Sequence, residues 1–425
     1  MSEWEERELG KLAAFQKGRK VDTSDFVQDG YLAYLGASGI EGRPDGFGDK
    51  RFGVLSLPSD TLMLWDGERS GLVGFGQLGV VASTVSRLSP NSEIEPKYLY
   101  FSLLGKFDWI QHRRTGTGVP HVPKDLGRIL KVQYPKSRIQ QQTIVAILTS
   151  IDTTIEKTEA LIAKYQQIKT GLMHDLFTRG VLPNGQLRPP REQAPELYQE
   201  TAIGWIPREW DLETLESLLA PVPNNIRSGP FGSALLKHEL VESGIPFLGI
   251  DNIHIESFNA EFRRFVSPKK FNELAKYAVR KRDVVITIMG TVGRSCVIPD
   301  NLEIALSSKH LWTMTFDLDR SVPRLICWQF NHSPWVKSWF RRAAQGGVMD
   351  AIQSKTLKRL LLPLPPPDEQ QRIDTRYGVV SSQIEREEQS LQKLKLQKLG
   401  LMQDLLTGKV AVTVDSQHNA PIHAL

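Results

Sequence analysis

Two pairs of adjacent arginines stand at matching places in the two halves of the sequence. Arg113 and Arg114 are followed closely by a Gly-Thr-Gly run, and Arg341 and Arg342 by a Gly-Gly pair. A guanidinium group forms charge-assisted hydrogen bonds with phosphate, and glycine lets the backbone approach a ligand closely. The pattern therefore predicts contacts with the phosphates of a nucleic acid. The alternative is that these cations only offset the dipole at the end of a helix.

Other polar residues could extend this surface. Arg294 follows a Gly-Thr-Val-Gly turn, from which it could contact a base edge or simply be solvated. Arg227 and Ser228 precede Gly229, where the backbone could lie close to DNA. For the remaining candidates, scattered surface charge is the alternative; they are Arg43, Lys50, Arg51, Arg69, Lys124, Lys309 and His310.

The residues and spacings that an enzyme of this size would need are missing. There is no Walker A run, no Asn/Asp-Pro-Pro-Tyr/Phe motif of amino-methyltransferases and no Ser-His-Asp order. Cys296 and Cys327 are the only cysteines, too few for a zinc site or a disulfide framework. We expect His121 and His254 to be structural or surface residues. The chain is therefore expected to be non-catalytic and to bind no metal or cofactor itself.

Composition limits the class of protein further. With 425 residues, 40% hydrophobic and 24% charged, the chain should form two or three soluble domains. Its net charge of +5 permits a polyanionic partner without demonstrating one. No apolar run approaches the roughly 20 residues of a membrane span, and the acidic start lacks the apolar core of a signal peptide. We expect a cytoplasmic protein without a membrane partner.

A long helical pattern occurs twice. The Gly-Leu-Met-x-Asp-Leu run at Gly171 returns at Gly400, 229 residues later. Apolar residues alternate at steps of four and three over more than four heptads in both copies, which is typical of a coiled coil. These positions, called the seam below, are Ile144, Leu148, Ile151, Ile155, Ile162, Tyr165, Leu172 and Leu176 in the first copy, and Ile373, Tyr377, Val380, Ile384, Leu391, Leu394, Leu401 and Leu405 in the second.

The two copies also share the interruptions of their seams. Thr158 corresponds to Glu387, and Lys169 corresponds to Lys398. Unrelated helices would rarely share such defects, so the pattern indicates an internal duplication. The two lysines could set the register of a helix pair or contact a partner, or their charges could simply reach solvent.

The segments before the two helical patterns repeat as well. Trp4 corresponds to Trp210, and the apolar pair Leu9 and Leu12 to Leu215 and Leu218, at an offset of 206 residues. The offset grows to 229, so the second copy should carry about 23 extra residues, expected in surface loops. We predict a first globular region (1–139), a first helix (140–180), a linker (181–200), a second globular region (201–367), a second helix (368–408) and a tail (409–425).

Each globular region should mix strands with short helices, which makes the fold class α+β. Strands are predicted at 53–55, 61–65 and 283–288, and helices at 96–111 and about 325–340, with Trp65 and Trp312 in the core. The two long helices should pair as an antiparallel coiled coil that separates the globular regions across a pseudo-twofold axis. A parallel pair stays open, because the linker is long enough to run back along the helices.

Such an arrangement would suit DNA. A helix of about 35 residues is about 50 Å long, and B-DNA presents the same groove face about every 34 Å. Two globular regions held apart by such helices would contact two short segments separated by an unread spacer. Because the two regions differ in sequence, the two DNA segments should differ as well.

The ordered set of motifs resembles the specificity (S) subunits of type I restriction-modification systems. The resemblance rests on the runs at 116–126, 226–233, 288–293 and 362–373 and on the duplicated Leu-Met-x-Asp-Leu helix end. It covers the whole chain in the order of that family, with two target-recognition domains each followed by a conserved helix. The first half departs from the pattern, because it is shorter and lacks the Gly-Pro-Phe-Gly run.

The resemblance implies a function in phage defence. The chain would bind an asymmetric bipartite site on double-stranded DNA and scaffold two methyltransferase (M) subunits, with restriction (R) subunits joining the complex. S-adenosylmethionine, ATP and Mg²⁺ would bind to those partners, which would carry out adenine methylation and ATP-dependent cleavage. The alternative class is a coiled-coil scaffold with tandem globular domains and no DNA affinity. An enzyme fused to recognition domains is disfavoured by the missing catalytic motifs.

Overall fold

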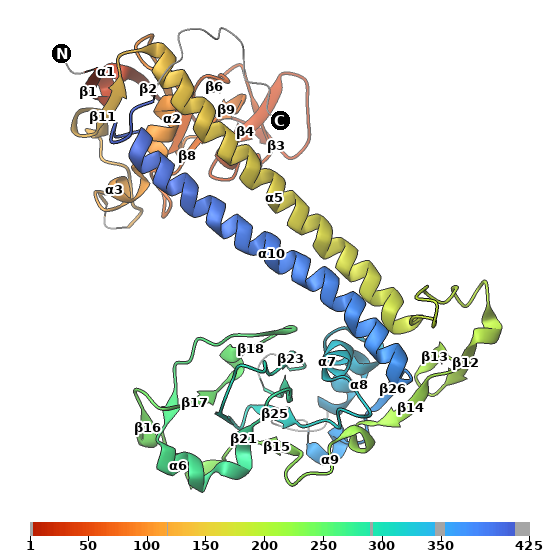
Figure 1. Ribbon diagram of the computed structural model, residues 1–425. Helices are drawn as coiled ribbons and strands as arrows, with labels where there is room; N and C mark the ends of the chain where they lie inside the picture. Colours follow the sequence, from red (N-terminus) through yellow and green to blue (C-terminus); the bar gives the residue numbers. More distant parts are fainter. Residues whose placement is uncertain (1–2, 117, 290–291, 345–352, 413–425) are drawn as a thin grey trace. The chain divides into compact units, whose positions relative to one another are not determined.

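The computed structural model describes residues 3–116, 118–289, 292–344 and 353–412 (Figure 1). The chain divides into two compact units, unit 1 with residues 1–163 and 386–425 and unit 2 with residues 164–385. Two long helices, α5 (Arg138–Thr178) and α10 (Pro367–Leu405), each contribute one part to each unit. Both helices lie where the seam predicts them. No helix among the described residues is long and apolar enough to cross a membrane.

Unit 1 contains three sheets. Their strand orders are β1-β11, β2-β10-β7-β8 and β3-β5-β4-β9-β6, and only β4 and β9 pair in parallel. The strands are β1 (Trp4–Glu8), β2 (Ala13–Lys17), β3 (Thr23–Ser24), β4 (Tyr31–Leu35), β5 (Phe47–Asp49), β6 (Val54–Ser56), β7 (Thr61–Leu64), β8 (Val73–Phe75), β9 (Gly79–Val81), β10 (Val85–Pro90) and β11 (Lys131–Pro135). The short helices are α1 (Leu9–Leu12), α2 (Pro96–Leu104), α3 (Phe107–Gln111) and α4 (Leu126–Ile129), with a 3-10 turn at Gly39–Glu41.

Unit 2 repeats these three sheets as β14-β26, β15-β25-β22-β23 and β16-β20-β17-β24-β21, again with one parallel pair, β17 and β24. The strands are β14 (Asp211–Thr214), β15 (Ile226–Ser228), β16 (Leu240–Val241), β17 (Ile245–Leu248), β20 (Phe265–Val266), β21 (Ala278–Val279), β22 (Val284–Thr287), β23 (Ser295–Val297), β24 (Ala305–Ser307), β25 (Leu311–Met314) and β26 (Leu361–Leu364). Two added hairpins pair β12 (Tyr198–Thr201) with β13 (Gly204–Pro207) and β18 (Ile253–His254) with β19 (Ser257–Phe258).

The helices of unit 2 follow the same plan. They are α6 (Pro268–Glu273), α7 (Pro323–His332), α8 (Pro334–Ala344) and α9 (Ser354–Leu357), with 3-10 turns at Pro195–Leu197, Leu215–Leu218, Gly232–Ala234, Lys237–Glu239, Ile250–Asn252 and Ala275–Tyr277. In the two parallel pairs, Leu35 lies opposite Val81 and Leu248 opposite Ser307. The offset has thus grown to 213 residues at the first of these positions and to 226 at the second. The extra residues fall between strands, where they include β18, β19 and α6.

Two helices predicted as continuous are each broken into two. The prediction at 96–111 is wrong at Gly105 and Lys106, which separate α2 from α3. Glycine disfavours the helix because it loses much backbone freedom there. The prediction at about 325–340 is wrong at Ser333, which has the extended backbone that a following proline imposes before Pro334 begins α8.

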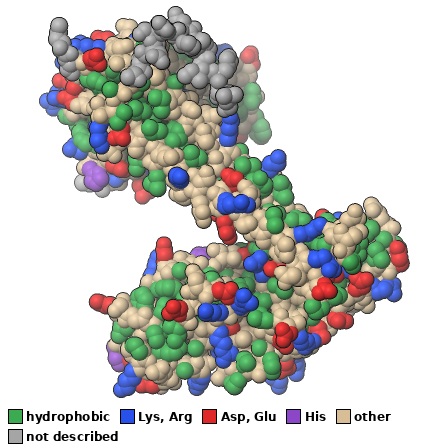
Figure 2. Space-filling view, viewed as in Figure 1, with side chains coloured by type: hydrophobic (Ala, Val, Ile, Leu, Met, Phe, Trp, Pro, Cys, Tyr) green, Lys and Arg blue, Asp and Glu red, His purple; other side chains and the backbone are tan. Residues whose placement is uncertain are grey.

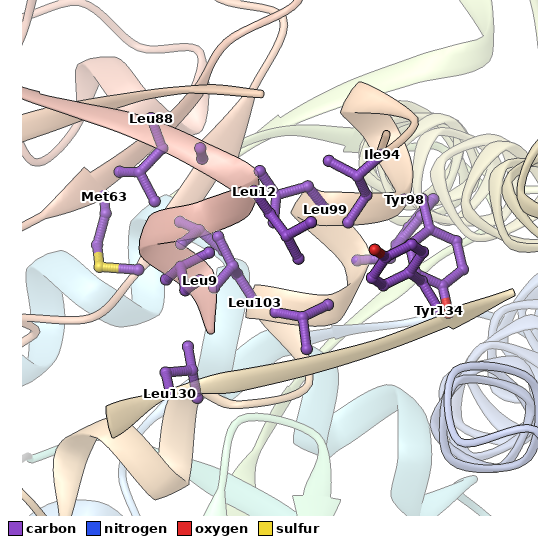
Figure 3. Packing of buried hydrophobic residues seen from close by; sticks show 14 of the residues in the cluster. Leu9, Leu12, Met63, Leu88, Ile94, Tyr98, Leu99, Leu103, Leu130 and Tyr134 are labelled. Carbon is purple, nitrogen blue, oxygen red and sulfur yellow. The ribbon is translucent and has the colours of Figure 1, made fainter. Parts of the chain in front are cut away.

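Each globular core continues onto the long helices. In unit 1, Leu9 and Leu12 pack with Leu99 and Leu103 of α2 and with Tyr134 of β11 (Figure 3). The same cluster includes buried residues from both long helices: Ile144, Leu148, Met402 and Leu405. In unit 2 a comparable cluster joins Met173, Leu176 and Phe177 of α5, Leu325 and Trp328 of α7, and Ile373 and Tyr377 of α10. The predicted core tryptophans, Trp65 and Trp312, are partly buried against the cores of their units.

Within unit 1 the long helices run in opposite directions. Nζ of Lys398 lies 2.6 Å from Asp152, and Nζ of Lys395 lies 2.8 Å from Glu159. The α5 partner thus moves toward the C-terminus as the α10 partner moves toward the N-terminus. Every predicted seam residue is buried or half-buried, which confirms the apolar face of both helices.

Candidate nucleic-acid interface

Arg113 is held by an aromatic ring at the end of α3. Its guanidinium lies 3.9 Å from the centre of the Trp109 ring and donates to the carbonyl of the same residue at 3.2 Å. The side chain is exposed, and among the described residues no carboxylate pairs with it. A cation positioned in this way loses little freedom on binding, so Arg113 is suited to contact a phosphate. Its neighbour Arg114 is half-buried and donates to the carbonyls of Gln111 and Glu68.

The corresponding arginines of unit 2 lie inside a helix. Arg341 and Arg342 are exposed in the last turn of α8, whereas the pair in unit 1 follows α3. Arg342 lies 5.1 Å from the centre of the Trp335 ring, and Arg341 donates to Oγ of Ser338 at 3.1 Å. Both units therefore hold an exposed arginine over a tryptophan. The Gly-Gly pair that follows lies outside the described residues.

Three basic candidates of unit 1 already have acidic partners. Arg43 and Arg69 share Glu41, at 3.3 and 3.0 Å. Arg51 forms an ion pair with the buried Asp49 at 2.6 Å, and this contact holds the pKa of the carboxyl below its usual range. Lys50 and Lys124 are exposed. These partners orient the arginines without removing them from solvent, so the three stay candidate contacts.

Two candidates of unit 2 do not belong to an exposed surface. Arg227 is 4% exposed and pairs with the buried carboxylate of Asp283. It also donates to the carbonyl of Ala278 and to Oγ1 of Thr315. Ser228 is 6% exposed and donates to the carbonyl of Lys309. Both assignments are corrected, because these side chains are used inside the fold.

Backbone hydrogen bonds gather the remaining candidates of unit 2. The N–H of Gly229 donates to Ser308, and the N–H of Ile288 donates to His310. Lys309 is exposed and His310 is half-buried. Burial, followed by the nearby charges of Lys309 and Arg264, lowers the pKa of His310, which is therefore neutral near pH 7. The half-buried Arg294 ends the turn that follows Ile288, part of which lies outside the described residues.

Equivalent positions in unit 1 reveal residues that the sequence reasoning missed. Gly18 follows β2 as Gly229 follows β15, and a Cβ on either would clash with a carbonyl at the end of β9 or β24. After these glycines the chains diverge, with exposed Arg19 and Lys20 in unit 1 and Phe231, which is 60% exposed, in unit 2. The Lys-Gly-Arg-Lys run at 17–20 was the available signal.

Charge is not confined to one face. Lys and Arg side chains are interspersed with Asp and Glu on the visible face of each unit (Figure 2). Contacts at chosen positions, such as Arg113 and Lys309, are therefore a better account of DNA affinity than a uniform basic surface. Among the residues that the structure describes, no group of three or more His, Cys, Asp or Glu could hold a metal ion.

The comparisons with known proteins agree with this arrangement. The family described as the type I restriction modification DNA specificity domain matches residues 1–167. The type I restriction enzyme MjaVIII specificity subunit of Methanocaldococcus jannaschii is 25% identical over 421 residues, covering 96% of this chain and 93% of the relative. The chain belongs to the type I restriction specificity subunits.

Solved structures show the fold of this specificity subunit in other proteins. The type I restriction-modification S subunit from M. genitalium has a TM-score of 0.60 and 15% identity, with 95% of this chain and 96% of that chain covered. A structure from a study of complex assembly and conformational transition of the type I R-M system has a TM-score of 0.54 and 17% identity, covering 96% and 98%. Both likenesses concern the mixed α/β fold.

Proposed function

We propose that this specificity subunit recognises an asymmetric, bipartite sequence on double-stranded DNA, one half by each globular region. The observation that carries the proposal is the duplicated fold. The three sheets have the same strand order in both units, but the loops at equivalent strand ends carry different side chains, such as Arg19 in one and Phe231 in the other. The same scaffold with different loops is suited to two different short sequences.

The long helices would set the distance between the two halves of the site. A helix of 41 residues, the length of α5, is about 60 Å long. We propose that α5 and α10 form an antiparallel coiled coil along their length and relate the two globular regions by a pseudo-twofold axis. Their opposite direction in unit 1 and the shared seam support this arrangement.

We further propose that the subunit assembles with M and R subunits. The related structure from a study of type I complex assembly supports such partners for this family. S-adenosylmethionine, ATP and Mg²⁺ would bind to those subunits. Because a base inside a duplex is out of reach, the M subunits would act on adenines flipped out of the helix.

The test is to purify the chain with the M subunit of its own operon and to map methylated adenines on DNA by single-molecule sequencing. We expect a split, asymmetric motif with a fixed gap of several base pairs. Replacing residues 1–139 by those of a related subunit should change one half of the motif only.

Methylation of a single continuous motif would contradict the two-region arrangement. Absence of methylation with a demonstrably active M subunit would favour the alternative, a coiled-coil scaffold without DNA affinity.

A further inference from the structure

A buried carboxylate joins the second globular region to both long helices within unit 2. Glu256 lies at the tip of the β18–β19 hairpin, and its side chain is 14% exposed. Its Oε2 lies 2.9 Å from Nζ of Lys169 on α5 and accepts a hydrogen bond from the hydroxyl of Tyr377 on α10. Its Oε1 lies 2.6 Å from Nε2 of His332 at the end of α7. Three helices therefore meet at one side chain of the hairpin.

The backbone of Glu256 is in a conformation that favours glycine. Its φ is +57°, in a two-residue turn whose flanking residues, His254 and Ser257, lie opposite each other. The left-handed conformation costs a residue with a side chain about 1–2 kcal/mol. The turn alone would favour glycine or asparagine, so the geometry points to the carboxylate as the reason for a glutamate here.

The hairpin is also attached to a loop of the candidate interface. The N–H of Glu256 donates to the carbonyl of Ser295 at 2.9 Å. Ser295 directly follows Arg294, one of the candidate DNA contacts. Asn331 of α7 holds the same residue from the other side, because its side chain accepts from the N–H of Ser295 and donates to its carbonyl. Glu256 thus lies between the long helices and this loop.

The duplication shows how unusual this contact is. Lys398 is the counterpart of Lys169 at the 229-residue offset, and in unit 1 it pairs with Asp152 on the partner helix. The counterpart of Asp152 in unit 2 is Ser381, which carries no charge. The lysine of unit 2 takes its acidic partner from the globular region instead, through Glu256.

A second substitution accompanies this change. Tyr377, whose hydroxyl donates to Glu256, corresponds to Leu148 in unit 1. Phe177 of α5 stacks on Trp328 at 3.7 Å, and that ring packs against His332 at 5.5 Å, so the cluster is closed by aromatic contacts. The corresponding position to Phe177 in unit 1 is Leu406. The polar cluster is therefore a feature of the second copy, built at a site where the first copy has only helix-to-helix contacts.

We propose that Glu256 is a positioning residue that fixes the second globular region on the helix pair and thereby sets the orientation of the loop at Arg294. The proposal rests on the proposed function for its consequence in DNA recognition. Its structural part, attachment of the hairpin through Glu256, stands without it.

Three variants of the full chain, each purified with the M subunit, separate attachment from charge compensation. Glu256→Gln removes the charge and keeps the side-chain length. The double variant with Glu256→Gln and Ser381→Asp returns an acid to the helix position at which Asp152 pairs with Lys398 in unit 1. Asp152→Asn removes the equivalent partner in unit 1 and is the matched control. Hydrogen exchange of residues 253–258, the unfolding temperature, and methylation of a library randomised in the half-site of the second region are measured.

Glu256→Gln should speed exchange in the hairpin by about tenfold or more, since a loss of about 1.4 kcal/mol corresponds to a factor of ten. It should also relax discrimination in the second half-site only. The double variant should regain unfolding temperature without regaining hairpin protection or discrimination. Asp152→Asn should lower the unfolding temperature and leave the hairpin and the second half-site unchanged.

Unchanged hairpin exchange in Glu256→Gln would overturn the proposal. So would full recovery of exchange and discrimination in the double variant, because Glu256 would then only neutralise Lys169. If the wild-type complex methylated no split motif, the proposed function would fail, while hydrogen exchange would still decide whether Glu256 attaches the hairpin.

Discussion

Gln141 and Gln370 occupy equivalent positions 229 residues apart and make the same hydrogen bonds, each within its own unit. The two residues are 0% and 1% exposed. Oε1 of Gln141 accepts from the N–H of Glu95 at the start of α2, and Oε1 of Gln370 accepts from the N–H of Val322 at the start of α7. Each Nε2 donates to two backbone carbonyls, those of Glu93 and Pro135 for the first and those of Arg320 and Pro365 for the second. The duplicated glutamine ties the first turns of each long helix to its globular region.

Replacing either glutamine by leucine should destabilise its unit. Each change leaves three buried backbone groups without partners, which should cost about 2–4 kcal/mol. Urea unfolding followed by tryptophan fluorescence, with hydrogen exchange to assign the unit, measures the loss. The neighbouring Gln142 and Gln371 are exposed, so their leucine variants are the controls and should stay within about 0.5 kcal/mol of wild type. Equal effects in the buried and exposed pairs would contradict this role.

The repeated helices could be predicted from the sequence because their signal is periodic. The seam positions and the shared interruption at Lys169 and Lys398 need only the spacing of residues along one helix. The sequence also indicated that Leu9 and Leu12 match Leu215 and Leu218, and all four are fully buried. It could not show which residue of each Gln-Gln pair is buried, because that depends on strands and turns elsewhere in the chain.

The candidate contacts were harder to predict, because side-chain partners far apart in sequence decide their roles. Arg227 looked available beside Gly229, but Asp283, 56 residues later, pairs with it inside the fold. Glu256 was missed because its lysine partner lies 87 residues away. Arg113 and Lys309 stay predictions as DNA contacts, since a basic side chain on the surface is common in any protein.

The stability of unit 2 should depend on pH through Glu256. Burial alone would raise the pKa of this carboxyl from 4.5, but hydrogen bonds from His332, Tyr377 and Lys169 lower it to about 2. Because the pKa is lower in the folded state, the contribution is fully present above about pH 4.5 and is lost as the pH falls toward 2. A shift of this size corresponds to about 3 kcal/mol.

The measurement is the difference in unfolding free energy between wild type and Glu256→Gln as a function of pH. Since the glutamine does not titrate, other acidic groups cancel in the difference. It should shrink by about 2 kcal/mol between pH 6 and pH 3. A difference that is constant over this range would show that the carboxylate does not carry the stabilisation.

Arg113→Ala should weaken DNA binding by the complex with the M subunit and reduce its salt dependence. Loss of one phosphate contact should lower the slope of log K against log salt by about 0.9. Arg113→Lys keeps the charge but loses the planar stacking on Trp109, so it should keep the slope and lower the affinity.

Titration of a fluorescent duplex at several salt concentrations tests both variants. The control is Arg128→Ala on α4, because Arg128 is exposed in the same unit and pairs with Asp125 at 2.9 Å. If Arg113→Ala and Arg128→Ala gave the same slope, Arg113 would not belong to the interface.

Gly180 and Gly408, which follow the two long helices, should tolerate no side chain. Their φ angles are +69° and +72°, a conformation that costs alanine about 1 kcal/mol or more. A Cβ on Gly180 would lie 2.0 Å from Oε1 of Glu369, which forms a buried ion pair with Arg188. A Cβ on Gly408 would lie 2.7 Å from the ring of Trp4.

Gly180→Ala should therefore destabilise more than Gly408→Ala, because it displaces a buried charged group as well as straining the backbone. The controls are Gly171→Ala and Gly400→Ala, equivalent helical positions with nothing within 4 Å of a Cβ. These two changes should stabilise by about 0.5–1 kcal/mol, since alanine favours the helix. Urea unfolding of the four variants tests the order, and a stabilising Gly180→Ala would mean that the helix end can rearrange away from the ion pair.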